Sequence, residues 1–312
     1  MTNIFFKVFN EKIKRILELN NQNIILYSNK TINILKYPKY EISFIIQNEK
    51  FMSINYICEY KPNILIISSK NKIYKIELNN NNSQYEILST YNIQFNCYKL
   101  LPLKNSNKIL YNSYHFFSII ENINEHIMQL NLIYKSKYSF FSIFQINENK
   151  LVISSYFEKS IIFLNTKFWT IISTINNIDL SLSNEIFCMI NNEILAVGGD
   201  LRSGIYFIDV KNHILKNQYK KNFFGYTILL NLENERFLGE SFSGRCYGES
   251  DDEEEDLLCT EIYQYDNIKI EPKLIKSGID RNNFNKRTFI IKLKNFDKIA
   301  YFVGKILYVE NF

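Results

Sequence analysis

Two apolar patterns alternate along this chain at a nearly constant distance. The first pattern is an apolar residue, a variable one, two more mostly apolar ones and then Asp, Glu, Asn or Lys. It begins at Ile32, Ile73, Phe117, Ile161, Ile205, Ile262 and Ile306, and four of the six intervals measure 44 residues. Short runs rich in Ile, Val, Tyr and Phe are typical of β-strands. The spacing therefore predicts seven copies of one β-rich unit.

A second strand-like run precedes each copy of this pattern. These runs begin at Asn23, Asn63, Lys108, Lys150, Glu193, Arg236 and Lys298, and usually a short polar turn joins the two runs. Short turns between β-rich runs predict hairpins. Further strand candidates flank the hairpins, starting before them at Phe51, Phe140 and Tyr226 and after them at Tyr40 and Thr170. Four strands in a unit of about 44 residues make the blade of a β-propeller.

The two ends of the chain fit the same architecture. The seventh unit stops at Phe312, shortly after its third strand, while residues 3–9 supply a strand-like run before the first complete unit. Pairing a terminal strand with the last blade removes an unpaired sheet edge. We therefore predict an all-β fold, a single seven-bladed propeller of four-stranded blades over residues 1–312, closed by the N-terminal strand. The predicted blades are 13–50, 51–96, 97–139, 140–181, 182–225, 226–285 and 286–312 together with 2–11.

The repeat resembles that of a degenerate WD40-type β-propeller over the whole chain. The pairs at 208–209, 265–266 and 309–310 stand where that family places its Trp-Asp dipeptide, and Asp200 resembles its Asp between the second and third strands. The single Trp169 lies outside that slot, and the family's Gly-His signature is missing. Gly198 and Gly199 resemble the double glycine of kelch propellers, which the other blades lack. The WD40 resemblance implies scaffold or adaptor work within a multiprotein assembly.

Composition supports a folded, β-rich intracellular protein. Hydrophobic residues make up 46% of the chain and aromatic residues 15%, while Ala196 and Ala300 are its only alanines, which favours strands over helices. The chain has no apolar run of the roughly 18 residues that span a membrane, and its start lacks a secretory leader pattern. The five cysteines are scattered, as is typical of reduced thiols. We expect a cytoplasmic protein, with the nucleus as the alternative, that is monomeric by itself and does not insert into membranes.

Motifs that carry enzymatic chemistry are absent from the sequence. It has no GxGxxG, no P-loop, no HExxH and no GxSxG. The repeat register puts His115 in a second-to-third-strand turn, and His126 and His213 in third-to-fourth-strand turns. These two kinds of turn lie on opposite faces of a propeller. A three-histidine zinc site is therefore disfavoured, and we expect exposed turn histidines. The sequence predicts no catalytic residue, no cofactor and no metal; a hydrolase with paired carboxylates at the channel mouth is the less favoured alternative.

Every predicted second-to-third-strand turn carries a basic residue. In a closed propeller these turns gather on one face, so their charges would form a ring that attracts an acidic peptide or protein, or RNA. The residues are Lys30, Lys70, Lys72, His115, Lys159, Arg202, Arg245 and Lys305. Exposed turns in a Lys-rich chain also carry Lys without binding anything. The leading hypothesis is a non-catalytic scaffold or adaptor, and the alternative is an RNA-associated propeller that acts in RNA processing or ribosome assembly.

One run of like charge stands out, and it falls in the single long interval of the repeat. The extra 13 residues there place the run in an insertion between the second and third strands of the sixth blade. Its members are Asp251, Asp252, Glu253, Glu254, Glu255 and Asp256. Like charges at this density repel and stay hydrated, so we expect an exposed loop tip. The run lacks the Gly and alternating ligands of a calcium loop, and it is a candidate docking loop for a basic partner.

Overall fold

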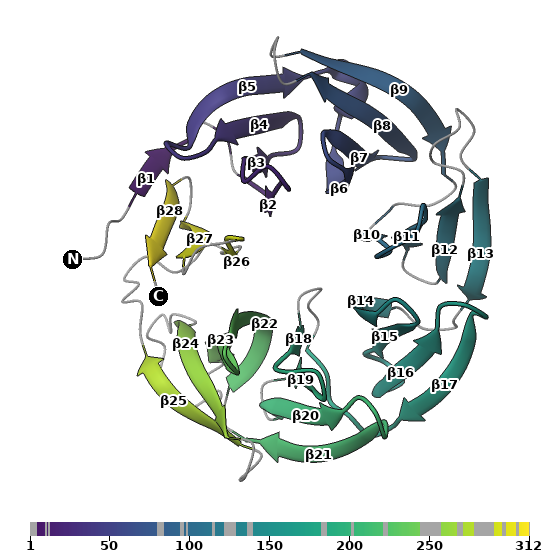
Figure 1. Cartoon of the computed structure of the whole chain (residues 1–312), viewed down its shortest axis with the longest axis vertical. Helices are drawn as coiled ribbons and strands as arrows, with labels where there is room; N and C mark the ends of the chain where they lie inside the picture. Colours follow the sequence, from purple (N-terminus) through teal and green to yellow (C-terminus); the bar gives the residue numbers. More distant parts are fainter. Residues whose placement is uncertain are drawn as a thin grey trace, which may run out of the picture. The chain divides into compact units, whose positions relative to one another are not determined.

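A computed structural model describes most of the chain. The described residues are 5–9, 11, 13–79, 84–93, 97, 99–113, 116–121, 129–135, 140–181, 186–200, 203–220, 224–243, 257–266, 271–277, 290–294, 298–303 and 306–311. In these residues 28 strands form seven four-stranded antiparallel sheets, and one short 3₁₀ helix accompanies them (Figure 1). This confirms the predicted all-β, seven-bladed propeller. The chain divides into two compact units, Met1–Lys137 with Arg287–Phe312, and Tyr138–Lys286.

The first unit contains four of the sheets, which we number by blade. Blade 1 consists of β2 (Arg15–Glu18), β3 (Ile24–Tyr27), β4 (Thr31–Lys36) and β5 (Glu41–Gln47). The 3₁₀ helix η1 (Glu49–Phe51) leads into blade 2, with β6 (Ile54–Lys61), β7 (Ile64–Ser69), β8 (Lys72–Asn79) and β9 (Gln84–Asn92). Blade 3 holds β10 (Lys99–Pro102), β11 (Ile109–Asn112), β12 (Phe116–Glu121) and β13 (Gln129–Lys135). Blade 7 holds β26 (Ile290–Lys292), β27 (Lys298–Val303), β28 (Ile306–Asn311) and β1 (Phe5–Val8).

The second unit contains the other three sheets. Blade 4 consists of β14 (Phe140–Asn147), β15 (Lys150–Ser155), β16 (Ser160–Asn165) and β17 (Thr170–Ile175). Blade 5 consists of β18 (Phe187–Met189), β19 (Ile194–Gly198), β20 (Ile205–Asp209) and β21 (Ile214–Tyr219). Blade 6 consists of β22 (Phe224–Glu233), β23 (Arg236–Ser243), β24 (Leu257–Asp266) and β25 (Glu271–Ser277).

The N-terminal strand completes blade 7, as the sequence predicts. Strand β1 pairs antiparallel with β28, from Phe5 opposite Val309 to Val8 opposite Ile306 (Figure 1). Phe9, directly after β1, is buried at 6% exposure in a cluster of residues from blades 7 and 1. The first and last strands of the sequence are therefore paired through their backbones, and Phe9 beside β1 packs in the same cluster as Leu307 and Val309 of β28.

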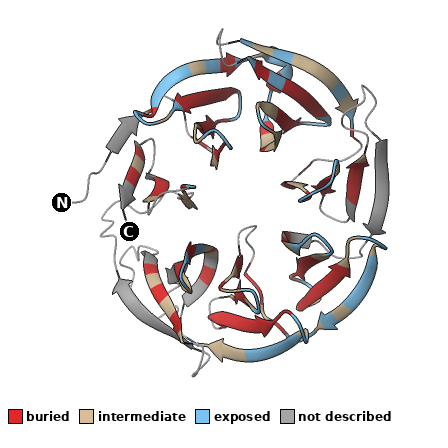
Figure 2. Ribbon diagram, viewed as in Figure 1, coloured by how far each residue is buried: buried red, intermediate tan, exposed pale blue. Residues whose placement is uncertain are grey.

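The two middle strands of each blade explain the unbroken apolar runs in the sequence. Ile25 and Tyr27 of β3 pack toward blade 2, whereas Ile24 and Leu26 of the same strand pack toward blade 7. A strand that is covered on both faces needs apolar residues at successive positions rather than at alternate ones. The outer strands β5, β17 and β21 are mostly exposed or half-buried, and Figure 2 shows the contrast.

Polar side chains join neighbouring blades at their first-to-second-strand turns. The Lys294 backbone N–H of blade 7 donates to Glu18 Oε2 of blade 1 at 2.5 Å, and the Asn20 N–H donates to Glu59 Oε2 of blade 2 at 2.7 Å. In the second unit, Asn191 Nδ2 donates to Glu235 Oε1 at 3.1 Å. Hydrogen bonds that involve a charged group are stronger than neutral ones. These turns are therefore held in place by residues that lie far away in the sequence.

The strand predicted to start at Phe51 begins three residues later, at Ile54. The Asn48 side chain accepts from the Lys50 N–H at 2.9 Å and caps η1, while Phe51 is fully buried edge-on against Tyr74, with ring centroids 5.0 Å apart. A capped turn with a buried aromatic residue outweighs the strand preference of the apolar pattern. The segment 48–53 consequently forms a surface feature between two blades.

Candidate interaction surfaces

The structure describes four of the predicted basic residues. Lys30 lies in the β3–β4 turn, Lys70 and Lys72 at the β7–β8 turn and Lys159 in the β15–β16 turn, and all four side chains are exposed. His115, Arg202, Arg245 and Lys305 lie outside the described residues, as does the acidic run from Asp251 to Asp256.

In the first unit, the segment after η1 connects two of these basic turns. The carbonyl of Asn29, beside Lys30, accepts from the Ile54 N–H at 2.8 Å, and the Ser53 carbonyl accepts from the Lys70 N–H at 3.4 Å. The Met52 carbonyl also accepts from Ser69 Oγ at 2.8 Å. Because residues 52–54 bond to both turns, the Lys30 and Lys70 turns lie on either side of this segment.

Two residues that the repeat did not single out join this surface. Lys50 is exposed, and its carbonyl accepts from the buried Tyr74 hydroxyl at 3.0 Å. Met52 follows with a side chain that is 45% exposed. We call Lys30, Lys50, Met52, Lys70 and Lys72 the lysine surface. The Asn48 cap is the sequence signal that could have identified the exposed position of Lys50.

Side-chain hydrogen bonds of Ser28, Thr31 and Glu11 hold the Lys30 turn in place. Ser28 Oγ accepts from the Lys30 and Thr31 N–H groups at 3.1 Å and 3.0 Å. Glu11 Oε2 in turn accepts from Ser28 Oγ at 2.5 Å and from Thr31 Oγ1 at 2.9 Å. Side-chain oxygens that bond nearby N–H groups fix a turn, so Lys30 projects from an ordered backbone. Glu11 beside the Lys30 turn and Glu49 beside Lys50 are fewer than the four lysines of the lysine surface, so positive charge is in excess there.

Lys159 has a structural contact that its place in the repeat did not indicate. Its Nζ lies 2.7 Å from Asp179 Oδ1, and its carbonyl accepts from the Ile178 N–H at 2.8 Å. The hydrogen bond to Asp179 raises the pKa of Lys159. Asp179 belongs to the connection between blades 4 and 5, so Lys159 ties this connection to its own turn. A charge reversal at Lys159 would therefore also perturb a structural ion pair.

His213 is half-buried, which corrects the expectation of an exposed turn histidine. Its ring lies 4.7 Å from the Phe163 ring, centroid to centroid, and its Nε2 lies 2.9 Å from Lys150 Nζ. An ammonium group can only donate, so Nε2 is the acceptor in this pair. Lys150 also donates to the Val210 carbonyl at 2.8 Å. Contact across the seam between blades 4 and 5 draws this turn residue inward.

We expect acid to destabilise the protein through His213. Burial, followed by the Lys150 charge, lowers the pKa of His213 below its unfolded value, while Asp209 opposes this shift. The unfolded chain therefore binds the proton first, and stability is lost as the pH falls below about 6.5. Chemical denaturation at about pH 7.5 and about pH 5.5 measures the loss. The variant His213→Asn, which tolerates the left-handed backbone at φ 55° and does not titrate, should lose less stability between these pH values. An equal loss in both proteins would contradict this role.

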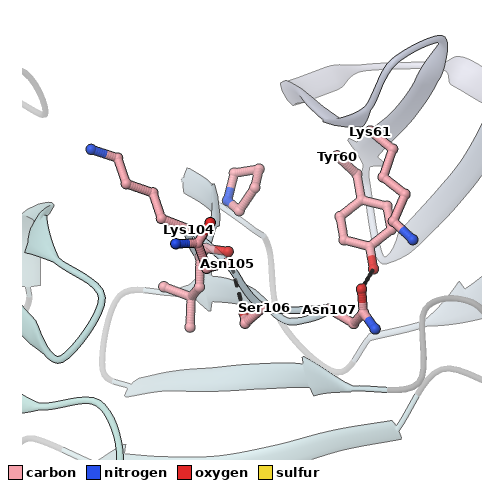
Figure 3. A pocket seen from close by; sticks show the side chains of 8 residues that line it. Tyr60, Lys61, Lys104, Asn105, Ser106 and Asn107 are labelled. Carbon is pink, nitrogen blue, oxygen red and sulfur yellow. Dashed lines mark hydrogen bonds between the residues drawn. The ribbon is translucent and has the colours of Figure 1, made fainter.

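A cleft of about 510 Å³ lies between blades 2 and 3 in the first unit (Figure 3). It is lined by Tyr60 and Lys61 at the end of β6, by Pro102 at the end of β10 and by residues 103–107 of the β10–β11 turn. The Tyr60 hydroxyl donates to Asn107 Oδ1 at 3.2 Å across the cleft. The turn is closed by its own bonds, with the Leu103 N–H donating to the Lys108 carbonyl at 3.0 Å. The repeat did not identify this site, because its residues come from turns in two different repeats.

Neither a metal centre nor a membrane-spanning helix is found in the part of the chain that the structure describes. No group of three or more His, Cys, Asp and Glu residues there is arranged to hold a metal ion. No helix among those residues has the length and apolarity needed to cross a bilayer.

Comparison with solved structures identifies the class of fold. The β-propeller domain of Cps50 (Swd1) from Myceliophteria thermophila has a TM-score of 0.72 at 10% identity and covers 100% of both chains. A chain of the Mitotic Checkpoint Complex has a TM-score of 0.75 at 9% identity, with 99% of this chain and 93% of that chain covered. The WD40 repeats of RRP9 have a TM-score of 0.72 at 10% identity, with 99% and 97% covered.

These similarities show that the fold is a WD40-type β-propeller, as the sequence resemblance implies. No protein-family model matches the chain, and no curated protein matches it in sequence. What this chain shares with these solved structures is therefore the fold.

Proposed function

We propose that this protein is a non-catalytic, intracellular interaction scaffold that binds an acidic segment of a protein partner at the lysine surface. The observation that carries the proposal is the set of hydrogen bonds that holds the turn of Lys30 and the turn of Lys70 and Lys72 against the segment that carries Lys50 and the exposed Met52. A group of like charges focuses the field and speeds the arrival of a partner of opposite charge. An exposed methionine adds an adaptable apolar contact.

The comparisons support this proposal. A chain of a multiprotein complex shares the fold over nearly its whole length. A WD40-type propeller offers rigid turns on which binding residues are held in fixed positions, and binding residues are found on such turns more often than in the core. The acidic run from Asp251 to Asp256 remains a predicted docking loop for a basic partner.

Charge reversal at the lysine surface should weaken partner binding and leave the fold intact. We expect Lys30→Glu combined with Lys72→Glu to change the free energy of unfolding by only about 0.5 kcal/mol per site, because both side chains are exposed. Association with an acidic partner should slow, and the effect should shrink as the salt concentration rises. The wild type and the Lys30/Lys72 variant are each used to capture partners from an extract at low salt, and the captured partners are compared by mass spectrometry. The association rates of both proteins are then measured with the purified partners.

The matched control is Lys36→Glu combined with Lys39→Glu, which reverses two exposed charges of blade 1 outside the lysine surface. The control should keep the partners that the first variant loses. Equal losses in both variants would show that net charge alone decides binding. Identical partners for the wild type and the Lys30/Lys72 variant would exclude the lysine surface.

The second candidate function, RNA binding, is favoured by the same lysines. A labelled single-stranded RNA distinguishes the two functions, since contacts to phosphates give a steep loss of affinity with salt. Tight, steeply salt-dependent RNA binding that Lys30→Glu and Lys72→Glu abolish would favour an RNA-associated propeller over a protein scaffold.

A further inference from the structure

We propose that the cleft between β6 and the β10–β11 turn is a second binding site, and that it takes an extended acidic segment of a partner protein. The cleft and the lysine surface lie at opposite ends of β7, which starts at Ile64 beside the cleft and ends at Ser69 beside the Lys70 turn. The inference therefore concerns a different surface from the proposed function and does not depend on it.

Charge is the first reason for this occupant. The cleft is lined by two lysines and by no carboxylate among its eight residues, all of them described. Figure 3 shows Lys61 on the same side as Tyr60 and Lys104 on the opposite side, with the Lys104 ammonium extending away from Tyr60. A segment lying across the cleft meets a positive charge at each side. Acidic residues near its two ends would complement these charges.

The shape and the polar groups of the cleft fit an extended backbone. Its volume of about 510 Å³ lies within the range of ordinary ligand sites. Pro102 and Leu103 supply apolar surface, and the side chains of Asn105, Ser106 and Asn107 supply hydrogen-bonding groups along one wall. Asn105 takes a left-handed backbone at φ 55°, and the Ser106 N–H donates to the Leu103 carbonyl at 3.3 Å. The wall is therefore formed before a ligand binds, which lowers the ordering cost of binding.

The aromatic group of the cleft favours a peptide over a nucleic acid. Single-stranded nucleic acids bind through bases that stack on open aromatic faces. The Lys61 ammonium lies 5.3 Å from the centroid of the Tyr60 ring, and the Tyr60 hydroxyl is bonded to Asn107. The ring is thus engaged by its own neighbours and offers no open face for stacking, whereas carboxylates form charge-assisted hydrogen bonds with lysine ammonium groups.

A random peptide library displayed on phage tests the site even while the natural partner is unidentified. The full chain is the bait, and selected peptides are resynthesised with a fluorescent label for polarisation titrations. We expect acidic peptides that bind about tenfold more weakly to the Lys61→Glu, Lys104→Glu double variant. They should bind with unchanged affinity to the Lys30→Glu, Lys72→Glu variant, which alters only the lysine surface. This comparison separates failure of the cleft from failure of the proposed function.

Two further measurements keep the result unambiguous. Lys61 is half-buried, so its replacement by Glu could also affect the fold. The single variant Lys104→Glu, on an exposed turn, is therefore tested beside the double variant, and the melting temperature of every protein is measured. Replacing one acidic residue of the peptide by Lys should restore part of the affinity for Lys104→Glu. Selection of neutral or basic peptides, no selection at all, or acidic peptides that ignore both cleft variants would overturn the proposal. An RNA that binds more tightly and is lost on Lys104→Glu would also overturn it.

Discussion

Deleting residues 1–9 should destabilise the protein severely. The deletion removes β1 and leaves β28 with an unpaired edge, because β28 pairs with β1 from Val309 back to Ile306. It also removes Phe9, whose burial is worth about 1.5–3 kcal/mol on its own. Whole domains have a stability of only about 5–15 kcal/mol, so the combined loss takes a large share of it. Thermal and urea denaturation of the truncated chain measure the effect.

Two controls separate strand pairing from the loss of chain length. Deleting residues 1–4 alone, which precede β1, should leave the melting temperature close to that of the full chain. A synthetic peptide of residues 2–11, added to the chain that lacks residues 1–9, should raise the melting temperature as its concentration rises. A truncated chain that melts like the full-length protein would contradict closure by the N-terminal strand.

Gly198→Ala should destabilise blades 5 and 6 where they meet. A Cβ at this position would lie 2.4 Å from the backbone oxygen of Tyr226, the residue whose N–H donates to the Gly199 carbonyl at 3.0 Å. Neither backbone can move without breaking hydrogen bonds, because the Gly198 N–H also donates to the Ile186 carbonyl at 2.9 Å. We expect a loss of about 3 kcal/mol, the upper end for an overpacked core, measured by urea denaturation.

Gly239→Ala is the matched comparison for this prediction. The atoms nearest to a Cβ at Gly239 belong to the Tyr226 ring, 2.9 Å away, and a side chain yields more readily than a backbone. The loss of stability at Gly239 should therefore be smaller than at Gly198. The reverse order would show that the approach of β22 to Gly198 does not limit the packing of these blades.

The sequence by itself determined the blades, because the forces that specify them act over short distances in the chain. The apolar run from Asn63, the polar turn at 70–72 and the run from Ile73 form one hairpin, β7 paired with β8. A hairpin is fixed by its own alternation of strand and turn residues, so a repeat read along the chain predicts it. Closure followed from the chain ends, since a seventh unit of three strands needs a fourth.

Only the tertiary structure decided the surfaces, because they form where blades meet. Lys50 and Met52 lie on the segment between blades 1 and 2, whose last two residues form backbone hydrogen bonds with the Lys30 and Lys70 turns. The cleft combines Tyr60 with a turn more than forty residues further on, through a bond to Asn107. Gly198 resembled the signature of another propeller family, yet its place is explained by the approach of Tyr226 from the next blade. Such contacts form across the seam between two blades, and the pattern within one repeat carries no information about how neighbouring blades pack together.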